Sequence, residues 1–393
     1  MRSFYSPFLF ALMLAFLVGC QTGTGNSQNL QTGADQTEEW LPVLKDQRVG
    51  LLVNHTSMVE ETHLVDKMLA EGVEVVRIFA PEHGFRGEAD AGEHVEDIVD
   101  EKTGIPVFSI YGSNRKPAPE QMEGLDVVIF DVQDVGVRFY TYISSMHYMM
   151  EACAENDVDF IVLDRPNPNG EYFDGPVLEP EFSSFVGMHP IPVVHGLTVG
   201  ELARMINGEG WLENGATCNL DVVKMNGYTH STEYSLPVKP SPNLPNDLSV
   251  RIYPSLCLFE ATIMSVGRGT EFPFQVVGAP DSVYGDFTFT PRSIEGMDSD
   301  PKYKGQKCYG KDYRGLAPWK QKFSLEPFFH FYEKSGNDSA FVSRRRWFHL
   351  LSGTDQLLQQ IEKGLSEEEI RETWKDELND YARLRQKYLL YPE

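Results

Sequence analysis

The chain has 393 residues, of which 41% are hydrophobic and 12% aromatic, a composition typical of a globular protein long enough for two domains. Its formal net charge of −24 argues against nucleic acid or an anionic membrane surface as a partner, because both attract basic proteins. A small anionic ligand is still compatible with this charge, since a few arginines can dominate a single pocket.

The first twenty residues have the features of a targeting segment. Arg2 gives a positive start, and the apolar run over residues 8–18 is too short to span a bilayer as a helix. The run ends in Leu17-Val18-Gly19-Cys20, the pattern of a bacterial lipobox, in which the Cys20 thiol accepts lipid. An ordinary secretory signal with a chance cysteine is the alternative.

The next segment, residues 21–39, is rich in Gly, Thr, Gln and Asn and predicts a flexible tether. We therefore expect an exported protein that is anchored to a membrane by lipid only. Its expected location is the periplasm or the outer cell surface.

The cysteines beyond the targeting segment are widely spaced: Cys153, Cys218, Cys257 and Cys308. In an exported protein they allow three pairings, and buried free thiols fit a domain of this size at least as well. They form no C-x-x-C pattern, so no metal site is expected. The chain also lacks a G-x-G-x-x-G motif after its first predicted strand and a G-x-x-x-x-G-K-[ST] motif, which disfavours nucleotide binding and leaves no cofactor expected.

Short apolar runs recur through the first half, at residues 49–53, 75–80, 107–110, 127–130 and 160–163. Some of the spacers between them, at residues 60–71 and 140–155, carry apolar side chains at helical spacing. Short β-branched runs that alternate with helices indicate a mostly parallel sheet. The predicted fold class is therefore α/β, with a doubly wound parallel sheet.

Helix signals continue into the second half. Thr198 and Glu201 form a capping box that opens a helix over residues 199–207, and Ser366 and Glu369 form another. Residues 239–246 are dense in proline, and we place the domain boundary there. The prediction is a catalytic domain over residues 40–245 and a C-terminal domain over residues 246–393.

Polar side chains follow each of the five apolar runs. The second run stops at Pro81 and leads into Glu82 and His83, on a turn that contains Gly84 and Gly87. The other four runs lead into residues 54–57, 111–112, 131–138 and 164–170. Because parallel strands present their carboxyl ends at one edge of the sheet, we expect these loops to form a functional cleft there. Unrelated polar loops are the alternative.

A second chemically rich turn lies at residues 266–271. Gly267 and Gly269 flank Arg268, which permits close approach of the backbone to a ligand and leaves a guanidinium available for a carboxylate. An arginine that caps a helix end is the alternative.

Together these motifs resemble those of the bacterial exo-β-N-acetylmuramidases, long known as a domain of unknown function. The matching segments are residues 81–84, 131–142, 164–168, 241–245, 266–270 and 388–392, so the resemblance covers about residues 40–393. It implies a Rossmann-like N-terminal domain and a smaller α/β or α+β C-terminal domain that completes a cleft. The implied activity is release of N-acetylmuramic acid from the non-reducing end of peptidoglycan fragments in cell-wall turnover. A muramic-acid-containing saccharide or muropeptide is the implied partner.

Glycoside cleavage needs a proton donor on the leaving oxygen and stabilisation of an oxocarbenium-like transition state. Glu82 is the predicted general acid, because partial burial after a strand favours the protonated form of a carboxyl group. His83 would tune this acid or bind a hydroxyl group. Asp131 and Asp134 are predicted to activate water or to stabilise charge, as is Glu271. The acetamido group of the substrate is an alternative nucleophile.

Muramic acid differs from glucosamine by a lactyl carboxylate, and a site that selects it needs a cation. The candidates are Arg138, Arg165 and Arg268; the alternative is that one or more of them pins a loop to Asp131 or Asp164. Tyr140 and Tyr142 are predicted to donate hydrogen bonds or to stack on the sugar. The other predicted substrate-binding residues are Asn54, His55, Gln133, Asp164, Asn167, Asn243, Thr270 and Glu271.

Two other functional classes stay open at this point. One is a lipid-anchored sugar-binding protein without catalysis. The other is a metal-dependent amidase or deacetylase that would use His55, Glu82 and His83, although the chain has no H-E-x-x-H motif to support it.

Overall fold

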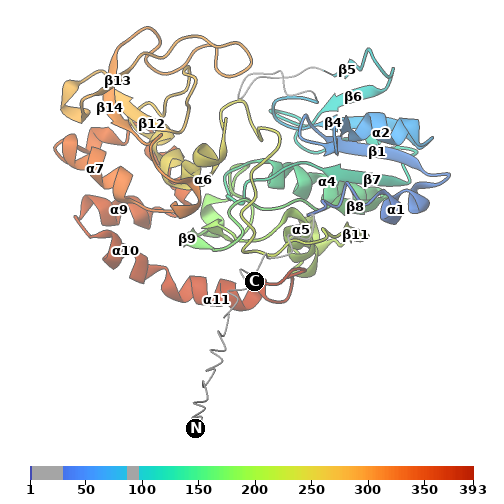
Figure 1. The fold of residues 1–393 in the computed structure, drawn as a ribbon. Helices are drawn as coiled ribbons and strands as arrows, with labels where there is room; N and C mark the ends of the chain where they lie inside the picture. The colour runs from blue at the N-terminus through green and yellow to red at the C-terminus, as the bar shows by residue number, and fades with distance from the viewer. Residues whose placement is uncertain (2–29, 86–96) are drawn as a thin grey trace.

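The computed structural model describes residue 1, residues 30–85 and residues 97–393. A seven-stranded sheet forms the N-terminal half, in the order β11-β8-β7-β1-β4-β6-β5 (Figure 1). Its strands are β1 (Arg48–Val53), β4 (Glu74–Ala80), β5 (Ile98–Val99), β6 (Pro106–Ser109), β7 (Val127–Asp131), β8 (Asp159–Leu163) and β11 (Leu220–Val223). The five predicted runs are confirmed as strands. All neighbours pair in parallel except β5 and β6, which are antiparallel.

The order of the parallel strands is that of a doubly wound Rossmann sheet. Counted along the chain, β6-β4-β1-β7-β8-β11 lie in the order 3-2-1-4-5-6. The predicted α/β fold class is thereby confirmed. The order reverses between β1 and β7, and ligands of such sheets bind outside the carboxyl ends of the strands at this switch point.

Helices cover both faces of the sheet because its strands are apolar on both sides. Val128 and Phe130 of β7 face the cluster that includes α4, whereas Val127 and Ile129 face the cluster that includes α2. The helices of this half are α1 (Thr37–Trp40), α2 (Leu64–Ala70), α3 (Pro119–Met122), α4 (Tyr142–Asn156) and α5 (Val199–Gly208).

Local signals explain where these helices begin. The capping box of α5 is present, since the Thr198 hydroxyl accepts from the Glu201 amide. The helix predicted over residues 60–71 begins later, at Leu64, because β2 (Met58–Val59) and β3 (Thr62–His63) pair as a short hairpin before it. His63 caps α2 by accepting from the Val65 amide.

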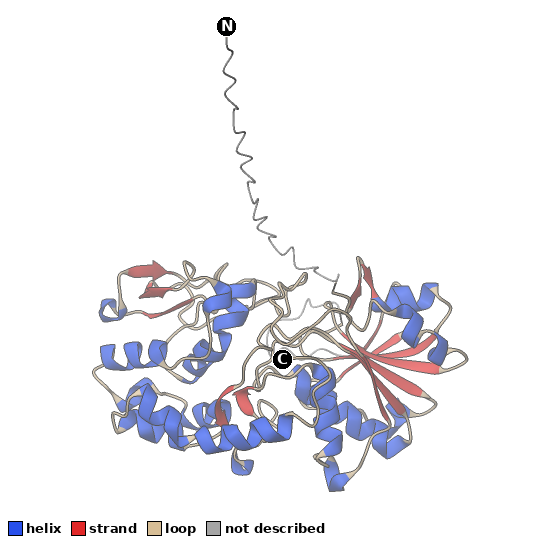
Figure 2. Ribbon diagram, turned by 60° about the horizontal axis from the view of Figure 1, so that its bottom comes forward, coloured by secondary structure: helices blue, strands red, loops and turns tan. Residues whose placement is uncertain are grey.

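The C-terminal half is smaller in its sheet and richer in helices (Figure 2). Its antiparallel sheet has the order β12-β14-β13, built from Val276–Ala279, Cys308–Asp312 and Phe287–Phe289. Its helices are α6 (Asp247–Leu256), α7 (Glu326–Lys334), α8 (Arg345–Ser352), α9 (Gln356–Glu362), α10 (Glu367–Thr373) and α11 (Lys375–Arg385). The capping box predicted at Ser366 opens α10. An antiparallel pair, β9 (Asp174–Val177) and β10 (Pro192–Val194), lies in the chain between β8 and α5.

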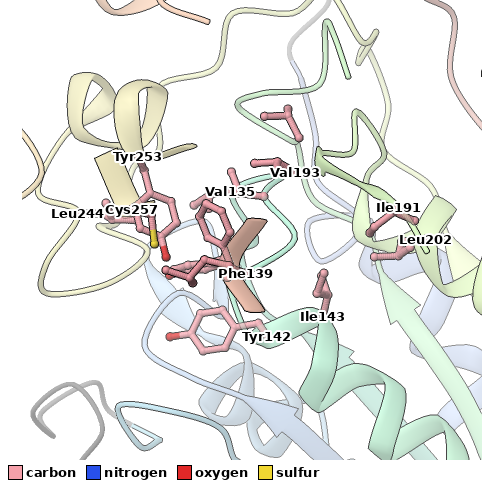
Figure 3. Close-up of a cluster of buried hydrophobic side chains, with 14 of the residues drawn as sticks. Val135, Phe139, Tyr142, Ile143, Ile191, Val193, Leu202, Leu244, Tyr253 and Cys257 are labelled. Atoms are coloured by element: carbon pink, nitrogen blue, oxygen red, sulfur yellow. The ribbon is translucent and has the colours of Figure 1, made fainter. Parts of the chain in front are cut away.

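One continuous hydrophobic core joins the two halves. Figure 3 shows part of it, with Tyr253 of α6 and Cys257, which directly follows this helix, beside Val135 and Phe139 of the loop after β7. The chain end also returns to the first sheet, where the Tyr391 hydroxyl donates to Asp164 Oδ2 at 2.7 Å. A shared core of this kind holds the two halves in a fixed relation.

The segment before β1 is packed from residue 30 onwards, which corrects the predicted tether at residues 30–39; residues 21–29 lie outside the described residues. The Gly33 amide donates to the Asp164 carbonyl at 2.8 Å, Ala34 is fully buried, and Thr32 and Gln36 are buried. The predicted signal segment, Cys20 and the turn glycine Gly87 lie outside the described residues. Among the residues described, no helix combines the length and the apolar character that a membrane crossing requires.

The four remaining cysteines, for which the sequence allowed either disulfides or free thiols, are all buried and unpaired: Cys153, Cys218, Cys257 and Cys308.

Candidate active site

The Glu82 carboxylate lies where the loops after β4, β6 and β7 meet. The Tyr111 hydroxyl donates to its Oε1 at 2.9 Å, and the Thr141 hydroxyl donates to its Oε2 at 2.9 Å. Burial and the negative charge of Glu82 raise the pKa of Tyr111, so this phenol stays protonated and able to donate. The half-buried carboxylate is thus held by hydroxyl groups from two separate loops.

His83 follows in a strained conformation. Its φ of 71° is in the left-handed region, which is uncommon for a residue other than glycine and is frequent at functional sites. Its ring is buried, and Nε2 lies 3.4 Å from the Ser241 hydroxyl. The His83 ring therefore lies beside the segment at residues 239–243.

That segment is drawn over the edge of the sheet by three side chains. The Tyr140 hydroxyl donates to the Pro240 carbonyl at 2.6 Å, and the Tyr142 hydroxyl lies 3.5 Å from both this carbonyl and that of Glu82. His55 Nε2 donates to the Lys239 carbonyl at 2.8 Å, and burial lowers the pKa of this imidazole. The structure therefore brings His55, Tyr140 and Tyr142 together near Glu82, and each of the three contacts a main-chain carbonyl.

Asn54 and Gln133 shape the loops at the switch point. Asn54 Oδ1 accepts from the Thr56 hydroxyl at 2.6 Å, and Thr56 Oγ1 accepts from the Gln133 amide at 3.0 Å. The Gln133 side chain donates to the carbonyls of Asp134 and Pro166. These contacts tie the loop after β1 to the loops after β7 and β8.

Asp131 and Arg165 form a buried ion pair with each other. Arg165 Nε donates to Asp131 Oδ1 at 2.5 Å, and Nη2 donates to Oδ2 at 2.8 Å. Asp131 is fully buried, and Arg165 Nη2 also donates to the Met58 carbonyl. Both charges are engaged within the protein, as in the loop-pinning alternative.

One carboxylate oxygen of Asp134 accepts a hydrogen bond and the other has no partner. Its Oδ2 accepts from the Gly136 amide at 2.6 Å and lies 3.6 Å from His195 Nε2. Its Oδ1 is buried and has no hydrogen-bond partner. Of the two aspartates predicted to assist catalysis, Asp134 keeps an unused acceptor.

Asp164 and Asn167 stabilise the return of the chain end and the start of α5. Asp164 accepts from the Thr198 hydroxyl at 2.7 Å and the Gly200 amide at 2.9 Å, in addition to Tyr391, and burial raises the pKa of this carboxyl to about 6. Asn167 Nδ2 donates to the Leu197 carbonyl. The structure does not bring these two side chains into contact with Glu82.

Arg138 is enclosed by main-chain carbonyls. Nη1 donates to those of Pro176 and Ile191 at 2.8 and 2.7 Å, and Nη2 donates to that of Leu351 at 3.0 Å. The side chain is fully buried, and burial lowers its pKa to about 9. Arg138 therefore joins the β9–β10 segment to the end of α8.

The turn at residues 266–271 supplies Arg268 from the C-terminal half. Arg268 Nε donates to Glu260 Oε1 at 2.7 Å, and Nη1 is buried without a partner. Thr270 Oγ1 donates to the Gly267 carbonyl and so stabilises the turn. Glu271 is 76% exposed and pairs with Arg292.

Asn243 reaches from the proline-dense segment to the C-terminal half. Its Nδ2 donates to the Met297 carbonyl at 2.9 Å, while Oδ1 is buried and has no partner.

Comparison with known proteins assigns the family. The model for the N-terminal domain of the exo-beta-N-acetylmuramidase NamZ matches residues 49–248, and the model for its C-terminal domain matches residues 251–391. The chain belongs to the NamZ family of exo-β-N-acetylmuramidases.

Relatives of known sequence and structure agree with this assignment. The chain is 37% identical, over 428 aligned residues and the full length of both proteins, to the peptidoglycan beta-N-acetylmuramidase NamZ of Bacillus subtilis strain 168. A crystal structure of a DUF1343 family protein from Bacteroides fragilis superposes with a TM-score of 0.86 at 44% identity, covering 93% of this chain and 99% of that one. A second one from the same organism gives 0.79 at 32% identity, with 92% and 99% covered.

Sequence reasoning missed the three hydroxyl groups that contact the acid and its neighbour: Tyr111, Thr141 and Ser241. Tyr111 lies two residues after β6, in one of the loops expected at the sheet edge, and Thr141 lies between the two predicted tyrosines. Hydroxyl residues are common in loops, and only the placement of one loop against another distinguishes these.

Proposed function

We propose that this chain is an exo-β-N-acetylmuramidase that releases N-acetylmuramic acid from the non-reducing end of peptidoglycan fragments. The observation that carries the proposal is the Glu82 carboxylate, oriented by Tyr111 and Thr141 at the sheet edge of a NamZ-family protein. A carboxyl group held in a fixed position is what protonation of a glycosidic oxygen requires.

In the proposed reaction Glu82 gives its proton to the oxygen of the leaving sugar as the bond from that oxygen to the anomeric carbon breaks. The positive charge that develops on the muramic acid ring is stabilised by a second group. Water finally adds to the anomeric carbon and gives its proton to the Glu82 carboxylate or to the second group. Asp131 and Glu271 are engaged in ion pairs with Arg165 and Arg292. The second role therefore falls to Asp134, whose Oδ1 is unpartnered, or to the acetamido group of the substrate.

The test is incubation of the purified protein with a disaccharide that has N-acetylmuramic acid at its non-reducing end, followed by mass spectrometry. Release of free N-acetylmuramic acid supports the proposal. Binding without cleavage would instead identify a sugar-binding protein. Activity that disappears in a chelator and returns with added metal would identify a metal-dependent amidase or deacetylase.

We also propose that the mature protein is exported and attached to a membrane through lipid on Cys20. The lipobox sequence supports this, and the chain is packed into the fold only a short distance after it, from residue 30. Expression in a bacterial host tests the idea. The unaltered chain should sediment with membranes and Cys20→Ser should not; equal sedimentation of the two would reject the anchor.

A further inference from the structure

The Arg268 guanidinium is held in place by the protein, and one of its nitrogen donors has no acceptor. Its Nε donates to Glu260 Oε1 at 2.7 Å, and its guanidinium lies over the Phe274 ring, 5.1 Å from the centroid. A guanidinium carries five N–H groups, and the Nη1 atom of this one is buried with no acceptor. Leaving a buried charged donor unpaired is costly, which indicates that an acceptor completes this site.

A row of buried aromatic rings connects Arg268 to Glu82. The row consists of rings in edge-to-face contact: Phe274, Tyr253, Tyr140 and Tyr142. Successive centroids are 4.9, 6.1 and 4.9 Å apart, and the Tyr142 hydroxyl lies 3.5 Å from the Glu82 carbonyl. Burial and the Glu82 carboxylate raise the pKa of Tyr111, and the positive charge of Arg268 opposes them, so Arg268 acts on the residue that holds Glu82.

The other arginines predicted to bind the lactyl group are engaged elsewhere. Arg165 is paired with Asp131, and Arg138 is fully buried with three hydrogen bonds to carbonyls. Arg268 differs from both because its side chain is 24% exposed, so a ligand can reach it. Glu260 accepts from Nε and Nη1 has no acceptor, so the guanidinium keeps donors with which it can bind a carboxylate.

We propose that Arg268 binds the lactyl carboxylate of muramic acid and thereby makes the site selective for muramides over glucosaminides. This inference rests on the proposed glycosidase function. In a chain with a net charge of −24, an anionic substituent needs a local cation to be favoured at all. Glu260 is a positioning residue that orients the guanidinium, and Asp298, whose charge also acts on Arg268, is the negative group that the lactyl carboxylate has to compete with.

The test compares three chromogenic substrates: the N-acetylmuramide, its lactyl methyl ester and the corresponding N-acetylglucosaminide. The unaltered protein should show a higher kcat/KM for the muramide than for its ester, by roughly ten- to a hundredfold, as expected for hydrogen bonds to a charged group. Arg268→Gln should lower the muramide-to-ester ratio to near one, chiefly through KM, because the lost contact is made in the bound ground state as well. Arg268→Lys, which keeps the charge, should restore part of the ratio.

Arg115 is the matched control, since it is a second arginine whose charge acts on Tyr111. Its Nε donates to the Gly112 carbonyl, and its guanidinium lies over the Phe185 ring. Arg115→Gln should leave the ratio unchanged.

Three results would overturn the proposal: equal rates of the unaltered protein on acid and ester, an unchanged ratio in Arg268→Gln, or loss of the ratio in Arg115→Gln. If the unaltered protein cleaves none of the substrates, the proposed function fails. Calorimetric binding of free N-acetylmuramic acid to the unaltered protein and to Arg268→Gln then still tests this arginine, and equal affinities would reject it.

Discussion

Two hydroxyl groups hold the Glu82 carboxylate, and removing them tests whether its orientation matters for the reaction. Tyr111→Phe and Thr141→Val each delete one donor while keeping most of the side-chain volume. The donors come from different loops, so in each variant the carboxylate loses one of the two hydroxyl groups that the described residues donate to it. Thr141→Ser keeps the hydroxyl and is the matched control.

The size of the effect follows from the energy of such contacts. A hydrogen bond to a charged group contributes about 1.5–3 kcal/mol, of which only the part that differs between ground state and transition state changes the rate. Loss of alignment adds to this, because the acid has to lie close to the glycosidic oxygen. We expect kcat to fall roughly tenfold in each single variant. The double variant should lose more, but less than the product, since both contacts act on one group.

The assay is steady-state kinetics on a chromogenic muramide, with thermal unfolding measured in parallel. Thr141→Ser should stay within about threefold of the unaltered kcat, because its hydroxyl can still reach Glu82 Oε2. A double variant that unfolds at the normal temperature and turns over at the normal rate would refute the reasoning.

The remaining predictions concern the other charged groups. Asp131→Asn or Arg165→Met alone leaves a buried charge unpaired and should reduce the free energy of unfolding by about 3–5 kcal/mol in urea titrations, and the double variant should recover much of it. A stable single variant would contradict a structural pair. Arg138→Met leaves buried carbonyls unpaired and should lower the free energy of unfolding by about 1–3 kcal/mol. It should not change the ratio of muramide to glucosaminide cleavage. Burial raises the pKa of Asp164 from 3.8 to about 6, so the native state holds this proton more tightly than the unfolded chain does. Its stabilising contribution is complete below pH 3.8 and is lost as the pH rises through about 6, so the difference in unfolding free energy between the unaltered protein and Asp164→Asn should decline by up to about 3 kcal/mol from pH 4 to 7. A difference that does not vary with pH would contradict this.

The sheet could be predicted from the sequence because its strands are buried on both faces. Runs such as residues 127–130 are continuously apolar, and such runs are typical of a parallel sheet when helical spacers follow them. The position of Glu82 followed from the same pattern, since a residue directly after a parallel strand lies at the edge where ligands bind. The position of a polar residue that directly follows a parallel strand can therefore be predicted from the sequence.

Contacts between loops could not be predicted from the sequence. Arg138, Arg165 and Arg268 all follow apolar runs and have the same chemistry. The first contacts main-chain carbonyls, the second a fully buried aspartate, and the third a partly exposed glutamate, Glu260. Composition was also misleading for residues 30–39, where polar and small residues predicted a tether. Thr32, Ala34 and Gln36 are buried there, and the Gly33 amide donates to the Asp164 carbonyl.

The central claim is that Glu82 protonates the glycosidic oxygen, and Glu82→Gln tests it most directly. The amide keeps the shape of the side chain and cannot supply the proton, so kcat on a disaccharide with N-acetylmuramic acid at its non-reducing end should fall by about 10²–10⁴-fold while the unfolding temperature stays the same. Retention of more than about a tenth of the rate would contradict the account and remove Glu82 as the acid.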